Sequence, residues 1–214
     1  GPFKLSSYEA GVKAVYERYD GWWGAGPEKK PYVDSVPLLT LGDPAARLNA
    51  LLGGTIHASA FIPFSQARSL ESNGAVKLFK AEAGQFVPFT MRLDQKPFDD
   101  PKVREAFKLA IDRQKTVEIA QSGYGTVGND VPGYGFASYN KDLPQHEHDP
   151  EKAKALLKQA GYDSIAVTLP TSDNAAGMLE SATAFREQAK ASGIDVTLKK
   201  IPADSYFSND LWTK

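Results

Sequence analysis

Few groups of side chains in this sequence could carry out chemistry, and the first is a pair of histidines beside an acidic residue. His146 and His148 flank Glu147, and imidazole and carboxylate groups are ligands of zinc and nickel. A stable metal site needs further donors that converge on the ion, yet the remaining histidine, His57, is distant in the sequence. The triplet also directly precedes a helix start at Asp149. We therefore interpret it as part of an exposed loop and expect no metal site.

A second pattern is the glycine spacing of GYGTVG at 123–128, which fits the GxGxxG pattern of dinucleotide-binding proteins. That fingerprint needs a strand before it and a helix after it, so that the phosphate meets the helix N-terminus. Here the pattern predicts a helix before the glycines and the irregular stretch NDVPGYG after them. We expect a loop that uses the backbone freedom of glycine, and no nucleotide or other cofactor.

Hydrolytic chemistry is not indicated either. The sequence contains no cysteine, no GxSxG and no HExxH. The acidic residues Asp43, Asp100, Asp112 and Asp149 each stand at a predicted helix start, where a carboxylate accepts hydrogen bonds from first-turn amides. Because nothing pairs an acid with a base, we expect no catalytic residue and a protein that binds its target without being an enzyme.

Composition narrows the classes of partner. The 214 residues include 25 Lys and Arg against 26 Asp and Glu, without a long run of one sign, so neither nucleic acid nor an anionic membrane is an expected partner. No apolar run reaches the length of a membrane span. A hydrophobic content of 42% is ordinary for a globular protein, and no Gly/Ser-rich linker divides the chain. We expect 1–214 to form a single α/β lobe.

Helices are predicted where an acidic cap precedes apolar residues at three-and-four spacing. The clearest follows Asp100 and Pro101, because proline at the first helical position loses no needed hydrogen bond and 103–111 carry the apolar stripe. The others are a short helix from Asp112 to a stop at Gly123, helices after Asp43 and Asp149, and helices near 65–70, over 175–191 and around Tyr206, Phe207 and Leu211.

Strands are predicted from short β-branched and aromatic runs that alternate with these helices. A hairpin is expected over 3–7 and 12–18, and a buried strand over 36–41; further strands are expected at 56–61, 76–79, 86–93, 165–170 and 194–201. Trp22 and Trp23 are expected to anchor the following loop on the core. The alternation predicts an α/β fold with a mixed sheet flanked by helices.

The stretch from Pro97 to Thr126 resembles the signature region of family 5 (cluster C) extracellular solute-binding proteins, which serve peptide, nickel and related ABC importers. PFDD, VR, AIDR and GYGT come in the order and spacing of that family, and DPAAR and DPEKAKALLKQAGY resemble it too. Family members have two lobes of a type II periplasmic-binding-protein-like fold. The resemblance implies that this chain is most of the second, C-terminal lobe and that the first lobe precedes it.

The resemblance implies a function in transport: capture of a solute outside the cytoplasmic membrane and delivery to an ABC permease. The expected protein is a periplasmic or extracellular monomer, anchored as a lipoprotein, and its expected solute is of the oligopeptide or oligosaccharide class. In dipeptide binders of the family, the loop matching 171–174 supplies an arginine for the peptide carboxylate, whereas this chain has Thr-Ser-Asp-Asn there. Free dipeptide is therefore a doubtful solute. The alternative is a ligand-sensing lobe of a regulatory protein fused to a DNA-binding region.

Ligands of α/β sheets gather at loops beyond the carboxyl ends of strands. Arg92, which stands where the family commonly has asparagine, could face the ligand or pair with Asp94 or Asp99, and we favour the pairing. The residues expected to contact the solute are Tyr124, Asn129, Asp130, Tyr134, Ser172, Asp173 and Asn174, with Arg92 and Phe61 as weaker candidates.

Overall fold

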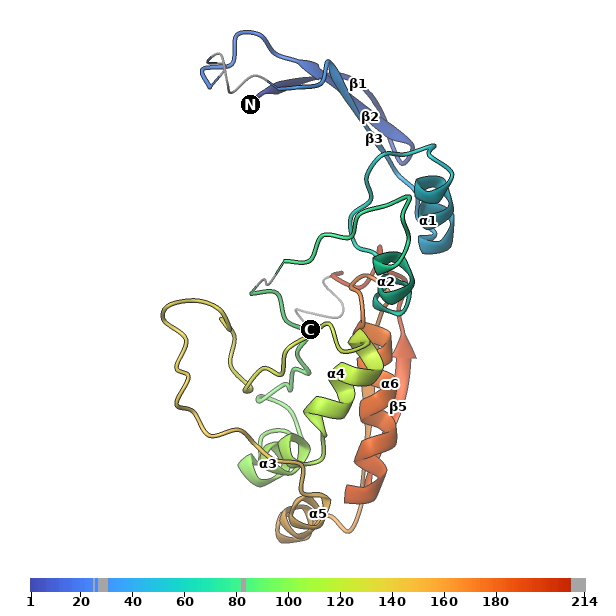
Figure 1. Ribbon diagram of the computed structural model, residues 1–214. Helices are drawn as coiled ribbons and strands as arrows, with labels where there is room; N and C mark the ends of the chain where they lie inside the picture. The colour runs from blue at the N-terminus through green and yellow to red at the C-terminus, as the bar shows by residue number, and fades with distance from the viewer. Residues whose placement is uncertain (25, 27–30, 82–83, 209–214) are drawn as a thin grey trace. The chain divides into compact units, whose positions relative to one another are not determined.

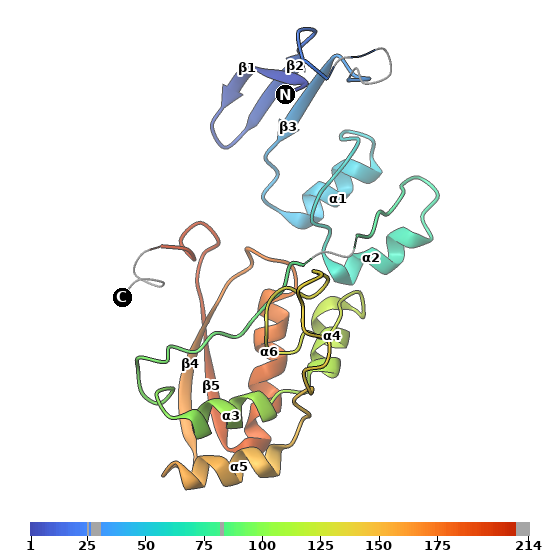
Figure 2. The ribbon, with the colours of Figure 1, turned by 90° about the vertical axis from the view of Figure 1, so that its left-hand side faces the viewer.

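The computed structural model describes residues 1–24, 26, 31–81 and 84–208 (Figures 1 and 2). The chain divides into two compact units, Gly1–Ala60 and Phe61–Lys214. The single-lobe organisation expected from the sequence stays a prediction.

The first unit is an antiparallel sheet followed by a helix. Strands β1 (Phe3–Glu9), β2 (Lys13–Arg18) and β3 (Ser35–Leu39) pair in that order, as the predicted hairpin requires. The helix α1 (Pro44–Leu52) starts at Asp43, whose side chain accepts a hydrogen bond from the Ala46 amide at 2.7 Å.

Burial in this first unit differs from the expectation. Strand β3 is mostly exposed and the Trp23 side chain is 92% exposed, so the predicted buried strand and the predicted anchoring by Trp23 are wrong, whereas Trp22 is partly buried. Within the described part of this unit, α1 likewise has no buried residue.

The second unit is built around a parallel strand pair. Strands β4 (Ile165–Thr171) and β5 (Ile194–Lys200) run side by side in parallel, with Ile165 opposite Ile194 and Thr171 opposite Lys200. Helix α6 (Met178–Ala189) and a 3₁₀ turn (Lys190–Ser192) connect them, and α6 packs against β5. This is the strand, crossover helix and parallel strand arrangement that the alternating pattern predicts.

The other helices of the second unit are α2 (Phe64–Glu71), α3 (Pro101–Leu109), α4 (Arg113–Gln121) and α5 (Pro150–Gln159). The aspartates at 100, 112 and 149 cap α3, α4 and α5 as predicted, each accepting a first-turn amide hydrogen bond. Helix α3 packs on α5, and α4 packs on α6.

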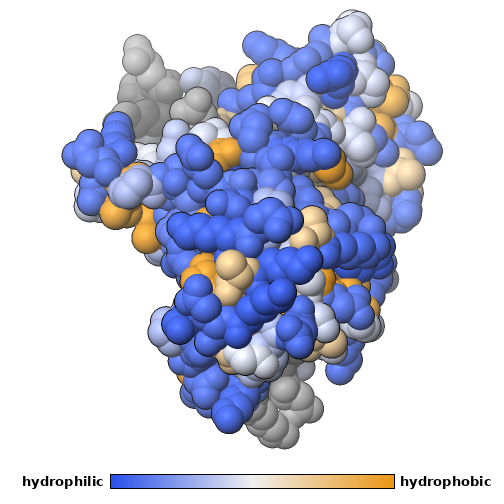
Figure 3. Space-filling view, turned by 90° about the horizontal axis from the view of Figure 1, so that it is seen from below, coloured by the Kyte–Doolittle hydropathy of each residue, from blue (hydrophilic) through white to orange (hydrophobic). Residues whose placement is uncertain are grey.

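The core of the second unit lies between these helices and the strand pair. It contains residues of α3, α5, α6, β4 and β5, such as Val103, Leu157, Phe185 and Ile194. The outward side of α5 is polar, and the face nearest the viewer in Figure 3 is correspondingly mostly hydrophilic. The mixed α/β fold is thus confirmed, with the antiparallel and parallel strands in separate sheets within the described residues.

Three predicted strands, at 56–61, 76–79 and 86–93, are wrong, because these segments make no ladder within the described residues. In the last, Val87, Phe89 and Met91 are partly buried while their neighbours are exposed. Alternating burial therefore shows that one side of this segment faces the core, but it does not show that the segment pairs with another strand. Of the final helix, Tyr206 and Phe207 lie in turns, and Leu211 lies outside the described residues.

Leu157 tests the position of the core, since its side chain is fully buried. We expect Leu157→Ala to lower the free energy of unfolding by about 2–5 kcal/mol, because it removes apolar contacts and leaves a cavity. Leu93 is 61% exposed, and Leu93→Ala should change the stability by about 0.5 kcal/mol or less. Urea denaturation followed by circular dichroism measures both, and equal losses would contradict this core assignment.

Candidate functional site

The carboxyl end of β4 carries four consecutive polar residues at 171–174, and the first two have buried hydroxyl groups. Thr171 and Ser172 are 1% and 0% exposed. The backbone here is paired, since the Ile201 amide donates to the Thr171 carbonyl at 2.8 Å. The side-chain oxygens Oγ1 of Thr171, Oγ of Ser172 and Oδ1 of Asn174 are buried without a hydrogen-bond partner among the described residues. Buried polar atoms are nearly always paired, so this grouping is unusual and needs an explanation.

Asp173 differs from its neighbours because its side chain faces solvent. Its Oδ2 lies 2.5 Å from Nζ of Lys200, the last residue of β5, and both side chains are more than half exposed. The parallel register places Thr171 opposite Lys200, which explains why these two loops meet at the same sheet edge. The edge therefore offers a carboxylate, an ammonium group and several uncharged oxygens.

The loop after α4 is held by Arg113, the first residue of that helix. Its guanidinium binds both carboxylate oxygens of Asp130, at 2.7 and 2.9 Å, and donates to the carbonyls of Lys108 at 3.1 Å and His146 at 2.9 Å. The Arg113 side chain is only 12% exposed. Asn129, the neighbour of Asp130, donates instead to the Leu143 and Pro144 carbonyls.

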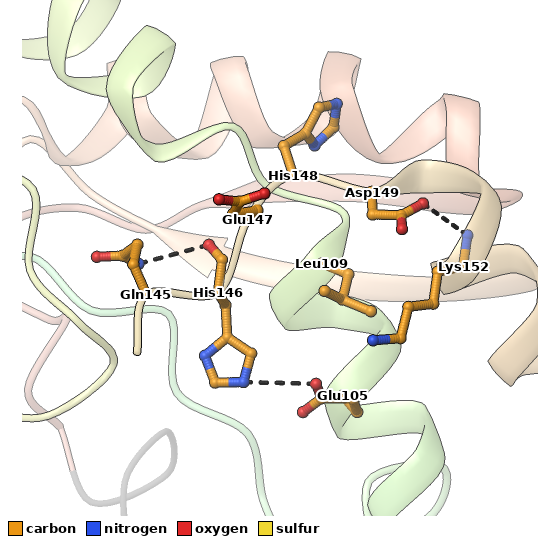
Figure 4. Close-up of a pocket in the computed structure, with 8 residues that line it drawn as sticks. All are labelled: Glu105, Leu109, Gln145, His146, Glu147, His148, Asp149 and Lys152. Atoms are coloured by element: carbon orange, nitrogen blue, oxygen red, sulfur yellow. Dashed lines mark hydrogen bonds and ion pairs between the residues drawn. The ribbon is translucent and has the colours of Figure 1, made fainter. Parts of the chain in front are cut away.

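His146 lies between two carboxylates, one of them beside an open pocket before α5 (Figure 4). Its Nδ1 lies 2.9 Å from Oδ2 of Asp130, and its Nε2 lies 3.4 Å from Oε1 of Glu105. The pocket has a volume of about 320 Å³, and the residues that line it are Glu105, Leu109, Gln145, His146, Glu147, His148, Asp149 and Lys152. Across the described ranges, no three His, Cys, Asp or Glu residues are grouped to hold a metal ion.

Tyr124 is positioned by α2. Its ring stacks on that of Phe64 with centroids 6.4 Å apart, and Nζ of Lys80 lies 5.2 Å from the Tyr124 centroid. Lys80 also pairs with Glu71, which lowers the pKa of the Glu71 carboxyl and raises the pKa of the Lys80 ammonium group. A hydrogen bond with Tyr124 lowers the pKa of Glu71 further. Tyr124 is therefore held by contacts with Phe64, Lys80 and Glu71.

The remaining candidates are more open. Arg92 forms a two-point ion pair with Asp94, at 2.9 and 2.7 Å, which confirms the pairing favoured from the sequence. Phe61 is 76% exposed and has a φ of 57°, a left-handed conformation that is uncommon for a bulky residue. Tyr134 is half-exposed, and its ring meets that of Tyr139 edge-on.

The candidates thus fall into separate groups: the end of β4, the loop after α4 including Tyr124, which stacks on Phe64 of α2, and the single positions Arg92 and Phe61. Their contact with a solute stays a prediction. Sequence reasoning missed Arg113, although a signal was present. A basic residue at the first position of a helix opposes the helix dipole, so a nearby carboxylate partner could have been expected.

The Glu71–Lys80 pair gives a pH-dependent prediction. Because Lys80 lowers the pKa of Glu71, the pair stabilises the structure at neutral pH, and this contribution is lost as the pH falls through the pKa of Glu71. We expect Lys80→Met to return that pKa toward its ordinary value. Lys77→Met is the control, since Lys77 lies over the Phe79 ring instead. Carboxyl NMR titration measures both, and an unchanged Glu71 pKa in Lys80→Met would refute the pairing.

No helix within the described ranges is both long and apolar enough to cross a membrane.

Several known proteins are similar to the chain. The glutathione-binding protein GsiB of Escherichia coli (strain K12) is 34% identical over 177 residues, which cover 81% of this chain and 33% of that protein. The chain therefore spans about a third of the length of the curated relatives it matches.

Two solved structures share its fold. DppA from Helicobacter pylori, in complex with the peptide STSA, superimposes with a TM-score of 0.83 at 24% identity, over 98% of this chain and 40% of that one. AppA from Bacillus subtilis, in complex with a nonapeptide, superimposes with a TM-score of 0.78 at 26% identity, over 96% of this chain and 43% of AppA. Residues 1–213 match the family described as bacterial extracellular solute-binding proteins, family 5 Middle, and the chain belongs to this family.

Proposed function

We propose that this chain is part of the solute-binding component of an ABC importer, which captures a peptide-like solute and delivers it to a permease. The observation that carries the proposal is the family match along 1–213. The relative GsiB is named as a glutathione-binding protein, and DppA and AppA were solved with peptides, which supports a solute of this class.

The end of β4 is the proposed contact surface. Ser172 and Asn174 carry buried side-chain oxygens that have no partner among the described residues, and Asp173 presents a carboxylate to solvent. Such groups suit the amides and amines of a peptide backbone, and they equally suit the hydroxyls of an oligosaccharide. No arginine stands at 171–174, so recognition of a terminal carboxylate by a bidentate guanidinium from this loop is not part of the proposal.

The mechanism we propose is binding without chemistry on the solute. A solute that contacts this unit and a second lobe favours a closed form by its differential affinity for that form. Because Ser172 is fully buried, its hydroxyl reaches a solute only if the 171–174 loop opens when the solute binds. Proteins of the family are extracellular, and we propose in addition that the parent protein is anchored as a lipoprotein and acts as a monomer.

Ser172 offers a test that separates a binding role from a structural one. Its buried hydroxyl has no partner in the part of the chain that the structure describes, so Ser172→Ala should leave the melting temperature unchanged or raise it. We expect the same substitution to weaken solute binding by about three- to tenfold, the effect of losing one hydrogen bond. The probes are glutathione and trialanine, measured by calorimetry on the intact protein that contains this chain.

Ser192→Ala is the matched control, because Ser192 is equally buried and unpartnered but precedes the amino end of β5. It should affect neither stability nor binding. Binding of neither probe by the wild-type protein would contradict a peptide-like solute. Equal weakening by both substitutions would contradict the placement of the contact surface at the end of β4.

A further inference from the structure

The segment between α4 and α5 is long, and the structure assigns it no helix or strand from Ser122 to Asp149. Long loops of this kind need side-chain contacts to hold one conformation, since no backbone ladder orders them. In Figure 1 it is the extended trace that leaves α4 and returns to α5.

The guanidinium of Arg113 joins two points of this loop. Arg113 binds the carboxylate of Asp130 near the start of the loop and the carbonyl of His146 near its end, and it also donates to the Lys108 carbonyl in the last turn of α3. Arginine suits this task because its planar fork donates in several directions at once. The loop is thereby tied to α3 and α4 through one side chain.

Further contacts reinforce the same closure. Nδ2 of Asn129 donates to the Leu143 carbonyl at 2.7 Å and to the Pro144 carbonyl at 3.2 Å, which joins the two sides of the loop. The His146 ring lies between the carboxylates of Asp130 and Glu105, and Figure 4 shows its contact with Glu105 on α3. Asp130 adopts a φ of 54°, a left-handed conformation that the surrounding contacts hold in place.

The tip of the loop, 131–142, carries aromatic side chains on a compact backbone. The Phe136 amide donates to the Gly133 carbonyl at 2.9 Å, and the Tyr139 amide donates to the Phe136 carbonyl at 3.0 Å. The rings of Tyr134 and Tyr139 meet edge-on with centroids 5.4 Å apart, and Phe136 is 61% exposed. Gly133 and Gly135 have positive φ values, which favour glycine, and they give the tip its two bends.

We propose that Arg113 is a positioning residue, whose closure of the loop at Asp130 and His146 fixes the aromatic tip that is presented to the solute. This inference rests on the proposed function, and it assigns Asp130 a role in holding the tip rather than in touching the solute. The geometry supports it because the Asp130 carboxylate is already bound at two points by Arg113 and faces His146. The exposed rings of Tyr134 and Phe136 suit an apolar or planar group of the solute.

Hydrogen exchange on the intact protein without solute tests the closure directly. Arg113→Gln removes the charge and the fork, and we expect the protection of the Phe136 and Tyr139 amides, which donate hydrogen bonds within 131–142, to fall by about tenfold or more, as loss of charged hydrogen bonds predicts. Protection in α5 and α6 should stay within about twofold, because these helices pack on the core independently. Arg113→Lys keeps the charge but cannot reach all four acceptors, so it should restore only a minor part of the protection.

Arg104→Gln is the matched control. Arg104 lies on α3 and also donates to backbone carbonyls, those of Phe98 and Asp99, so its loss should affect that segment and leave 131–142 protected. Asp130→Asn removes the carboxylate that binds Arg113, from a position outside the helices. If Arg113→Gln does not fold, this variant tests the closure of the loop in its place. It should lower protection at 131–142 in the same selective way.

Two results would overturn the inference: unchanged protection at 131–142, or a uniform loss throughout 61–208, which would make Arg113 a general stabiliser. Calorimetry with glutathione and trialanine then tests the link to binding, where Arg113→Gln and Tyr134→Ala should weaken binding by similar factors and add little to each other. Full additivity would contradict positioning of Tyr134 by Arg113. If wild type binds neither probe, the solute proposal fails, whereas the exchange result stands on its own.

Discussion

The parallel pairing of β4 with β5 is the constraint on which the arrangement of the second unit depends. Parallel strands cannot be joined by a tight turn, so the chain between them must cross over, and here it does so through α6. The same pairing brings the ends of both strands to one edge, where Asp173 meets Lys200. Strand direction therefore brings the polar residues at 171–174 and Lys200 to the same edge.

The candidate contact residues lie mostly in loops, and without a backbone ladder these loops are ordered by side-chain contacts. At the end of β4, side-chain oxygens of Ser172 and Asn174 are buried without a hydrogen-bond partner among the described residues, so they can bind a solute once the 171–174 loop opens. After α4 the situation is reversed, because Arg113 and Asn129 use their hydrogen bonds to hold the backbone and leave aromatic rings exposed.

The sequence predicts best those features that depend on local chemistry. The acidic caps at 100, 112 and 149 locate three helices because cap and stripe lie within one short window. The segment at 86–93 was predicted as a strand from its alternation, but strand pairing depends on a distant partner that alternation does not reveal. The sequence placed Ser172, Asp173 and Asn174 beyond a strand end, whereas the closure by Arg113 joins residues far apart in the chain and emerged only from the structure.

The most direct test of the account is a crystal structure of the intact protein that contains this chain, grown with glutathione or trialanine. The account predicts that the solute lies against 171–174, with Oγ of Ser172 or Oδ1 of Asn174 within hydrogen-bond distance of it, since these atoms lack a partner here. A solute bound elsewhere, with both atoms still unpaired, would contradict the claim that the end of β4 is the binding surface.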